Sequence, residues 1–399
     1  MKWEKVLLGE VTDSCLGKML DQEKNRGEYQ PYLANVDVRW GSFNLDDLSE
    51  MRFEKDEQER YGLKYGDLVV CEGGEPGRCA IWKNQIPNMK IQKALHRVRV
   101  HDCLDYRYLY YWFLLAGKTG GLEQYFTGAT IKHMPGQKLK SVVIDKPPIG
   151  IQRSIADVLS SYDDLIENNQ KQIKLLEEAA QRLYKEWFVD LRFPGHENTK
   201  ITDGIPEGWR MAVLSEIASV NKESISKQYP YDYVDYIDIG AVSKGQINSV
   251  TRLSTKDAPG RAKRIAFDGD VLWGMVRPNL KSYALVFHPK ETSVFSTGFA
   301  ILHAEKVPFS FLYCHVTQDE FVSYLINCTN GAAYPAVKPS HFENAVLLVP
   351  TDMVLSKFHS LVGQMFRQAE ILEQKNQQAI EARDRLLPKL MSGEIEVEK

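Results

Sequence analysis

The sequence is poor in cysteine, and its few cysteines are not spaced as a metal site or a disulfide framework requires. They form no C-x-x-C pair and no cluster with histidine, so we expect buried thiols and no structural zinc. The six are Cys15, Cys71, Cys79, Cys103, Cys314 and Cys328. No apolar run reaches the roughly 18 residues that a membrane helix needs, and the start, MKWEKVLLGEVTDS, lacks the pattern of a signal peptide. We therefore expect a cytoplasmic protein.

Catalytic motifs are missing as well. The sequence has no G-x-x-x-x-G-K-[ST] loop for nucleotide phosphates, no G-x-G-x-x-G loop after a strand and no Asn-Pro-Pro-aromatic stretch of the amino-methyltransferase kind. Glu373-Gln374-Lys375 has the Glu-x-Lys spacing of some nucleases, but it falls in a predicted helix, and we interpret it as an exposed helix face. We predict no catalytic residue, no metal site and no bound cofactor in this chain.

The net charge is small, yet two segments contain several basic residues and no acidic one. The formal charge of −3 does not by itself indicate a nucleic-acid binder. Pro76 to His101 nevertheless contains no acidic residue and six basic ones, which are Arg78, Lys83, Lys90, Lys93, Arg97 and Arg99. Val271 to Lys290 contains Arg277, Lys281 and Lys290, again with no acidic residue. Two interpretations remain open at this point: contact with DNA, or ordinary solvated surface.

The chain contains the same pattern twice. Gly66-Asp67, before an apolar strand-like run, recurs as Gly269-Asp270 at a shift of 203 positions. Trp3 to Glu10 aligns with Trp209 to Glu216 at a shift of 206, and Lys140 to Pro147 aligns with Glu343 to Pro350. Because the register persists over a whole domain length, we infer a duplicated domain and not a solenoid. Gly-Asp before a strand is a common turn, and no second ligand accompanies it, so we interpret it as turn chemistry.

Each copy is predicted to be a mixed α/β domain followed by a long helix. Short β-branched and aromatic runs alternate with Gly and Pro, and helices are predicted near Tyr106 to Ala116 and near Phe309 to Asn327. After each copy, residues recur at alternating steps of four and three, the seam of a coiled coil, and Asn169 and Asn376 are expected to fix the pairing. The predicted seam residues are Ile155, Leu159, Tyr162, Ile166, Asn169, Ile173 and Leu176, then Phe358, Val362, Met365, Leu372 and Asn376.

The helical segments resemble those of a known family. PPIGIQRSIADVLSSYDDLIENNQKQIKLLEEAAQRLYKEWFVDLRFPG, IPEGW and RDRLLPKLMSGEI are similar to the corresponding parts of the specificity subunits of type I restriction-modification enzymes. The resemblance covers essentially the whole chain and implies the family's order of parts. These are a target-recognition domain (1–147), a spacer helix (148–190), a linker (191–206), a second target-recognition domain (207–350) and a second spacer helix (351–391).

The resemblance also implies a function and partners. Each domain would bind one half of an asymmetric, two-part DNA site, while two long antiparallel helices would set the gap between the halves. The chain itself would be non-catalytic. Two methyltransferase subunits would bind S-adenosylmethionine and methylate adenine N6, and restriction subunits would bring ATP, Mg²⁺ and DNA cleavage.

The residues that read DNA cannot be transferred from the family, because its recognition domains differ with the sequence that each reads. Base edges are read by Arg, Lys, Asn and Gln, and phosphates are held by Lys and Arg. On residue type and position we predict contacts from Arg78, Lys90, Gln92, Lys93, Thr130 and Lys132 in the first domain, and from Arg277, Asn279, Lys281, Tyr334, Lys338 and Ser340 in the second. The alternative function is a coiled-coil scaffold that binds only proteins; a fused restriction-methylation enzyme is disfavoured by the missing motifs.

Overall fold

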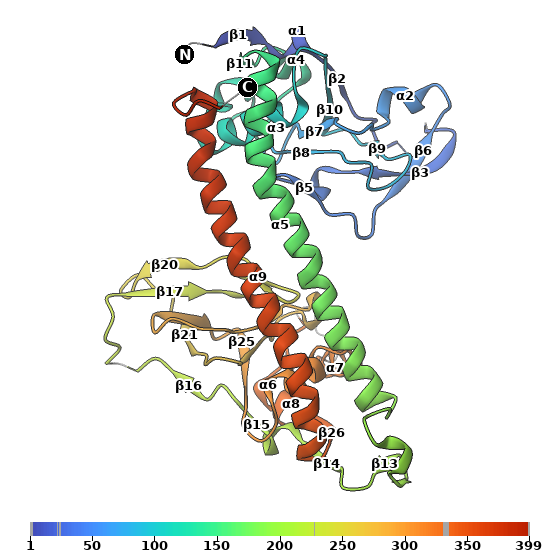
Figure 1. Ribbon diagram of the computed structural model, residues 1–399, viewed down its shortest axis with the longest axis vertical. Coiled ribbons are helices and arrows are strands. Elements are labelled where there is room, and N and C mark those ends of the chain that lie inside the picture. The colour runs from blue at the N-terminus through green and yellow to red at the C-terminus, as the bar shows by residue number, and fades with distance from the viewer. Residues whose placement is uncertain (1–2, 22, 24, 227, 330–334, 398–399) are drawn as a thin grey trace. The chain divides into compact units, whose positions relative to one another are not determined.

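The chain forms two compact units in the computed structural model, which describes residues 3–21, 23, 25–226, 228–329 and 335–397 (Figure 1). The first unit contains residues 1–168 and 375–399, and the second contains residues 169–374. Each unit therefore holds one copy of the repeat and one stretch of each long helix. Among the described residues, no helix combines the length and apolar character needed to cross a membrane.

The first unit is built around a four-stranded antiparallel sheet in the order β2-β10-β7-β8, a three-stranded sheet in the order β6-β3-β9, and the pair β1-β11. Helix α3 packs on the first sheet; it starts where the Asp105 carboxylate accepts hydrogen bonds from the N–H groups of Arg107 and Tyr108. The strands are β1 (Glu4–Leu7), β2 (Thr12–Leu16), β3 (Glu28–Leu33), β4 (Val38–Arg39), β5 (Ser42–Phe43), β6 (Glu50–Phe53), β7 (Leu68–Cys71), β8 (Cys79–Ile81), β9 (Lys90–Ile91), β10 (Leu95–Val100) and β11 (Val143–Lys146). The helices are α1 (Leu8–Val11), α2 (Glu57–Tyr61), α3 (Tyr106–Lys118) and α4 (Gly136–Lys140).

The second unit repeats this plan. Its four-stranded sheet has the order β15-β25-β22-β23, its five-stranded sheet the order β16-β21-β24-β17-β20, and β14 pairs with β26. The strands are β12 (Ile201–Thr202), β13 (Ile205–Pro206), β14 (Arg210–Val213), β15 (Ala218–Val220), β16 (Glu223–Ser224), β17 (Tyr233–Ile237), β18 (Val242–Ser243), β19 (Gln246–Ile247), β20 (Thr251–Ser254), β21 (Ala262–Ile265), β22 (Val271–Gly274), β23 (Tyr283–Leu285), β24 (Ser293–Ser296), β25 (Phe299–Ala304) and β26 (Val346–Val349). The helices are α6 (Phe309–Val316), α7 (Asp319–Asn327) and α8 (Pro339–Glu343). Equivalent strands pair in the same order in both copies, which confirms the duplication.

The helix predicted near residues 309–327 is divided into two helices in the structure. The sequence suggested a single helix over Phe309 to Asn327, but α6 ends at Val316 and α7 begins at Asp319. At the break, the indole N–H of Trp273 donates to the carbonyl oxygen of Val316 at 2.9 Å. Gln318 adopts an extended conformation (φ −65°, ψ 150°) that no helix continues through. The core tryptophan thus provides a partner for a carbonyl at the helix end.

The repeated Gly-Asp turn places a buried carboxylate beside the central strand of each domain. Asp67 accepts a hydrogen bond from the Lys64 N–H at 2.7 Å and two from the Arg99 guanidinium on β10, both at 2.7 Å. Asp270 accepts from the Phe267 N–H at 2.7 Å, and its other oxygen lies 2.7 Å from Nδ1 of His303 on β25. Both aspartates are 1% exposed. The carboxylate therefore closes the turn and ties it to the neighbouring strand, as expected for turn chemistry.

The two long helices are α5 (Ile149–Tyr184) and α9 (Asp352–Ser392), about 54 and 60 Å long at 1.5 Å per residue. In the first unit Ile155 and Leu159 of α5 share a core cluster with Leu387 and Leu390 of α9. In the second unit Ile173 clusters with Ala369 and Leu372, and the ring of Tyr184 lies 6.1 Å from that of Phe358. Early residues of α5 contact late residues of α9, and late residues of α5 contact early residues of α9. The helices are therefore antiparallel within each unit.

The predicted seam positions face the interior. Ile155, Leu159, Ile166, Asn169, Ile173, Phe358, Val362, Leu372 and Asn376 are buried, and Tyr162, Leu176 and Met365 are partly buried. Arg383 is charged and therefore interrupts the apolar pattern of the seam. Its guanidinium Nη1 lies 2.5 Å from the Asp163 carboxylate of α5. Asp163 also accepts a hydrogen bond from the Tyr111 hydroxyl at 2.6 Å. An ion pair with a tyrosine partner therefore replaces apolar packing at this point.

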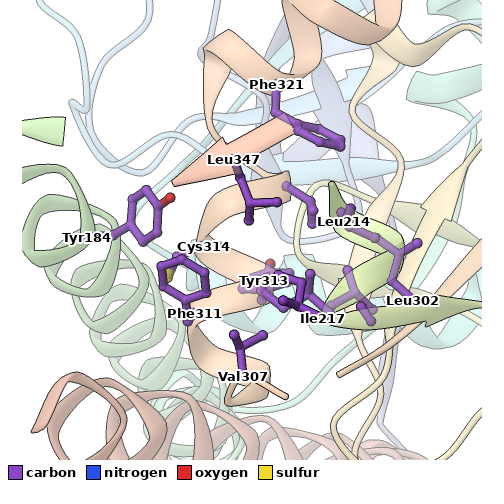
Figure 2. Packing of buried hydrophobic residues seen from close by; sticks show 14 of the residues in the cluster. Tyr184, Leu214, Ile217, Leu302, Val307, Phe311, Tyr313, Cys314, Phe321 and Leu347 are labelled. Atoms are coloured by element: carbon purple, nitrogen blue, oxygen red, sulfur yellow. The ribbon is translucent and has the colours of Figure 1, made fainter. Parts of the chain in front are cut away.

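The helices are part of the domain cores and not separate rods. Around Tyr184, the second unit packs Phe311, Tyr313, Leu214 and Leu347 into one cluster (Figure 2). The segment predicted as a linker also contributes, because Phe193 is 3% exposed and its ring lies 4.7 Å from that of Trp209. This packing anchors the end of α5 within the second unit.

Candidate nucleic-acid interface

In the first unit, the loops that follow β3, β7 and β9 converge. The Gln92 N–H donates to Leu33 O at 3.0 Å, and the Glu72 N–H donates to Ala94 O at 2.8 Å. The Asn35 side-chain amide donates to Gly73 O at 2.6 Å, and Gly73 forms an antiparallel bridge with His133. Residues 34–37, 72–78, 92–94 and 126–133, here called the first loop cluster, are thus joined by main-chain bonds.

The second unit builds an equivalent cluster after β17, β22 and β24. The Met275 N–H donates to Gly298 O at 2.9 Å, as Glu72 does to Ala94, and Val276 forms an antiparallel bridge with Ala336. The Arg277 N–H donates to Pro335 O at 2.8 Å. The second loop cluster comprises residues 238–241, 275–281, 297–298 and 335–338, with Arg261 bonded to it through its carbonyl, which accepts from the Thr297 N–H at 2.8 Å.

Most of the predicted DNA contacts lie on these clusters. Lys93, Thr130 and Lys132 are exposed on the first, and Arg277, Asn279 and Lys338 are exposed on the second. Gln92 is partly buried, and Lys281 is bound to Asp319 by a 2.7 Å ion pair. Ser340 is exposed in the first turn of α8, beside the second cluster. Tyr334 lies outside the described residues.

Two predicted contacts must be corrected. Lys90 is 3% exposed, its ammonium donates to Asn88 O at 2.8 Å, and burial lowers its pKa, so it no longer stands as a DNA-contact candidate. Arg78 holds the first cluster together from inside: it donates to the Asn35 side-chain oxygen at 2.9 Å and to Glu75 at 3.0 Å. Its side chain is only 17% exposed, and we assign it to loop structure.

Three other basic residues of the same segment bind groups within the first unit. Lys83 pairs with Glu167 of α5 at 2.7 Å, Arg97 donates to Glu59 O at 2.8 Å, and Arg99 holds Asp67. Of the six basic residues between Pro76 and His101, Lys83 and Lys93 are exposed, and Lys83 is the one paired with Glu167. Most of the basic run therefore makes contacts within the first unit.

Sequence reasoning missed residues that only the fold brings to the clusters. Trp40 donates from its indole N–H to Glu75 at 2.7 Å and lines a hollow of about 560 Å³ with Glu75, Phe126 and Lys132. Arg261, with a side chain 61% exposed, donates to the Tyr236 hydroxyl at 3.0 Å and pairs with Asp238 at 3.1 Å. Trp40 carried no local signal, whereas Arg261 begins the basic stretch RAKR and could have been noticed.

Arg277 has a backbone conformation that normally belongs to glycine. Its φ of 51° lies in the left-handed region, where a residue with a side chain is disfavoured by about 1–2 kcal/mol. Gly74, 203 positions earlier and at the same place after β7, has φ 73°. Strain of this kind persists where the surrounding structure holds it and often marks a functional position.

The clusters offer hydrogen-bond donors and cations on loops held by main-chain bonds. No group of three or more His, Cys, Asp or Glu side chains suited to a metal ion occurs within the described part of the chain. Exposed Arg, Lys, Asn and Thr side chains on such loops can reach phosphates and base edges of a duplex. The geometry is that of a recognition surface.

Comparison with known proteins agrees with this geometry. Residues 1–178 match the family model described as the type I restriction modification DNA specificity domain. The type I restriction enzyme MjaIX specificity subunit of Methanocaldococcus jannaschii is 28% identical over 84% of this chain and 78% of its own. The MjaVIII specificity subunit of the same organism is 23% identical over 99% and 93%. The crystal structure of the type I restriction-modification S subunit from M. genitalium is similar in fold, with a TM-score of 0.56, 17% identity and coverage of 98% and 96%.

Two similar α/β domains, each with a loop cluster and a share of an antiparallel helix pair, define a non-catalytic DNA-recognition protein. Residues 1–178 thus match the type I restriction modification DNA specificity domain, and the relatives that align with most of the chain are specificity subunits of type I restriction enzymes. These matches support a DNA-recognition role in a type I restriction-modification system, as the resemblance in the helical segments implied.

Proposed function

We propose that each domain reads one half of a two-part DNA site through its loop cluster, and that the two halves differ in sequence. The observation that carries this proposal is the construction of equivalent loop clusters, held by equivalent main-chain bonds, with different exposed side chains. The first cluster presents Lys93, Thr130 and Lys132 next to Trp40 and Glu75, and the second presents Arg277, Asn279 and Lys338 next to Arg261. Two readers of one architecture with different side chains suit two unlike half-sites.

The proposed partners do the chemistry. Each domain docks one methyltransferase subunit, which binds S-adenosylmethionine and methylates adenine N6, and restriction subunits that use ATP and Mg²⁺ join the complex. The chain itself binds none of these cofactors in this proposal. Since its substrate is the DNA of the cell or of an invader, the proposed compartment is the cytoplasm. The proposed division is target-recognition domains at 1–147 and 207–350, a linker at 191–206, and spacer helices at 148–190 and 351–391.

Methylome mapping tests the proposal directly. Co-expression of this chain with its cognate methyltransferase in a host that lacks other adenine methylation is expected to produce N6-methyladenine within a single two-part motif with a fixed gap of unspecified bases. Single-molecule sequencing of the genomic DNA reads both the motif and the gap. The control is the methyltransferase without this chain, which is expected to leave the motif unmethylated. A stable complex that methylates no defined motif would favour the protein-binding scaffold instead.

Shortening both helices tests the spacer role. Deleting residues 168–174 of α5 and 370–376 of α9 removes one heptad from each helix, keeps the seam in phase, and takes out both buried asparagines together. Seven residues correspond to about 10 Å, so the gap in the methylated motif is expected to shorten by up to about three base pairs while both half-sites stay the same. A motif with an unchanged gap contradicts the spacer role. Deleting the heptad from α5 alone serves as the control, and it is expected to abolish methylation because the seam no longer matches.

A further inference from the structure

Positions 74 and 277 are equivalent in the repeat, but Gly74 has no side chain and Arg277 has a long, charged one. The two positions are 203 residues apart, as are the two Gly-Asp turns. Gly74 lies three residues after the end of β7, and Arg277 lies three residues after the end of β22. The preceding residues make the same contact: Gly73 bridges His133, and Val276 bridges Ala336. Both backbones are left-handed, with φ 73° at Gly74 and 51° at Arg277. The two loop clusters thus share the bridge before this position and its left-handed backbone, while the side chain and the main-chain bonds that follow it differ.

The fold around Arg277 is held by main-chain contacts. Its N–H donates to Pro335 O at 2.8 Å, its carbonyl accepts from the Leu280 N–H at 2.9 Å, and the next residue, Pro278, is buried. A glycine could make both main-chain bonds and would relieve the left-handed strain, as Gly74 does in the first copy. The arginine is therefore retained at a place where the backbone alone would favour glycine.

We propose, building on the function proposed above, that Arg277 is the base-specific determinant of the second half-site and that it reads a guanine. The planar guanidinium can donate two hydrogen bonds to O6 and N7 of guanine from a pre-organised fork, which the flexible ammonium of lysine lacks. Arg277 is exposed, and it lies on the cluster that also carries Asn279 and Lys338. In the first domain the equivalent glycine has no side chain, so no base is read from that position. One position of a shared scaffold thereby distinguishes the two half-sites.

The test uses the complete complex with the cognate methyltransferase and Arg277→Gly, which installs the residue of the first copy. Methylation rates are measured on duplexes in which each base of both half-sites is varied in turn. The wild-type complex is expected to prefer guanine at one position of the second half-site by about 10- to 100-fold. The R277G complex is expected to lose that preference and to keep every other one, including all of those in the first half-site.

Two further comparisons separate base reading from phosphate contact. Replacing the guanine with 7-deazaguanine, which lacks the N7 acceptor, is expected to slow the wild-type complex and to leave R277G unaffected. Arg277→Lys keeps the charge without the planar fork, so it is expected to lose most of the guanine preference while it still binds DNA. Lys256→Ala is the matched control, because Lys256 is exposed in the turn after β20 and outside the cluster; it is expected to leave every base preference intact.

The outcomes are distinguishable. A wild-type complex without a two-part motif would overturn the proposed function, and the inference with it. A clear motif in which R277G and R277K keep every preference, or in which they slow methylation of all sequences equally, would overturn this inference alone. A second half-site that contains no guanine would do the same. Thermal unfolding of R277G, expected at or above the wild-type midpoint, verifies that a loss of preference does not reflect a loss of fold.

Discussion

Replacing Asp67 with alanine is expected to lower the stability of the first unit by about 3 kcal/mol or more, because it leaves a partly buried arginine without its partner. Asp67 is 1% exposed and holds Arg99 through two 2.7 Å hydrogen bonds, while it also accepts from the Lys64 N–H. Arg99 is only 27% exposed, so water replaces the lost carboxylate poorly. The hydrogen bonds that Arg99 donates to Asp67 raise the pKa of its guanidinium, and the arginine stays charged at every working pH with or without them.

The measurement is urea unfolding of the full chain, followed by hydrogen exchange of the β7 and β10 amides, which report on the first unit. Glu59→Ala is the control in the same unit, because it breaks an exposed pair in which Lys64 lies 3.5 Å from a side chain that is 85% exposed. That change is expected to cost under about 0.5 kcal/mol. Equal losses in the two variants would show that the buried pair contributes no more than a surface pair. The β22 and β25 amides of the second unit are expected to be unaffected by either change.

The duplicated fold could be predicted from the sequence because its signals are local or periodic. The seam of α5 and α9 depends on a repeat of about 3.5 residues, which can be counted along the chain. The strands around Gly66-Asp67 and Gly269-Asp270 are short apolar runs bounded by turn residues. The reason for the break at Arg383 could not be predicted in this way, because its partner, Asp163, lies 220 positions away.

The DNA-contact candidates were harder to predict from the sequence, because they depend on contacts between residues far apart along the chain. A basic side chain that already binds an acidic or carbonyl oxygen of the protein is less available to DNA, and the fold decides which oxygens lie near it. Glu167 lies 84 positions from Lys83, and the Glu59 carbonyl lies 38 positions from Arg97. The basic run therefore contributed mainly structural contacts, and Arg277 lies on an exposed loop, where its contact with DNA stays a prediction. Glu373 was interpreted as lying on an exposed helix face; it is only partly exposed, and its charge acts on Glu177.

Glu177 on α5 is expected to make the second unit less stable as the pH rises through 7. Burial raises the pKa of this carboxyl to about 7; Lys244 opposes the shift and Glu373 adds to it. The side chain faces the turn between β18 and β19, where a Cβ on Gly245 would lie 3.2 Å from its Oε1. The folded state thus binds a proton that the unfolded state, with a pKa near 4.5, releases. The stability is fully present below pH 4.5 and is lost as the pH rises through 7.

Glu177→Gln removes this titration and keeps the shape of the side chain. At pH 8.5 the variant is expected to be more stable than the wild type by about 3 kcal/mol, the free energy of a pKa difference of about 2.5. The advantage is expected to shrink toward zero as the pH falls to 4.5. His315, whose pKa burial lowers to about 4, is present in both proteins, so its contribution cancels in the difference.

Urea unfolding between pH 5 and 8.5, followed by exchange of the β22 and β25 amides, measures that difference in the second unit. Glu178→Gln is the matched control: its side chain is 51% exposed and pairs loosely with Lys174 at 4.0 Å, so no change with pH is expected. An E177Q advantage that is the same at every pH would mean that the carboxyl is already ionised at pH 5, and that Lys244 and not burial governs its charge. A pH-dependent advantage instead shows that α5 packs more favourably within the second unit when Glu177 holds its proton.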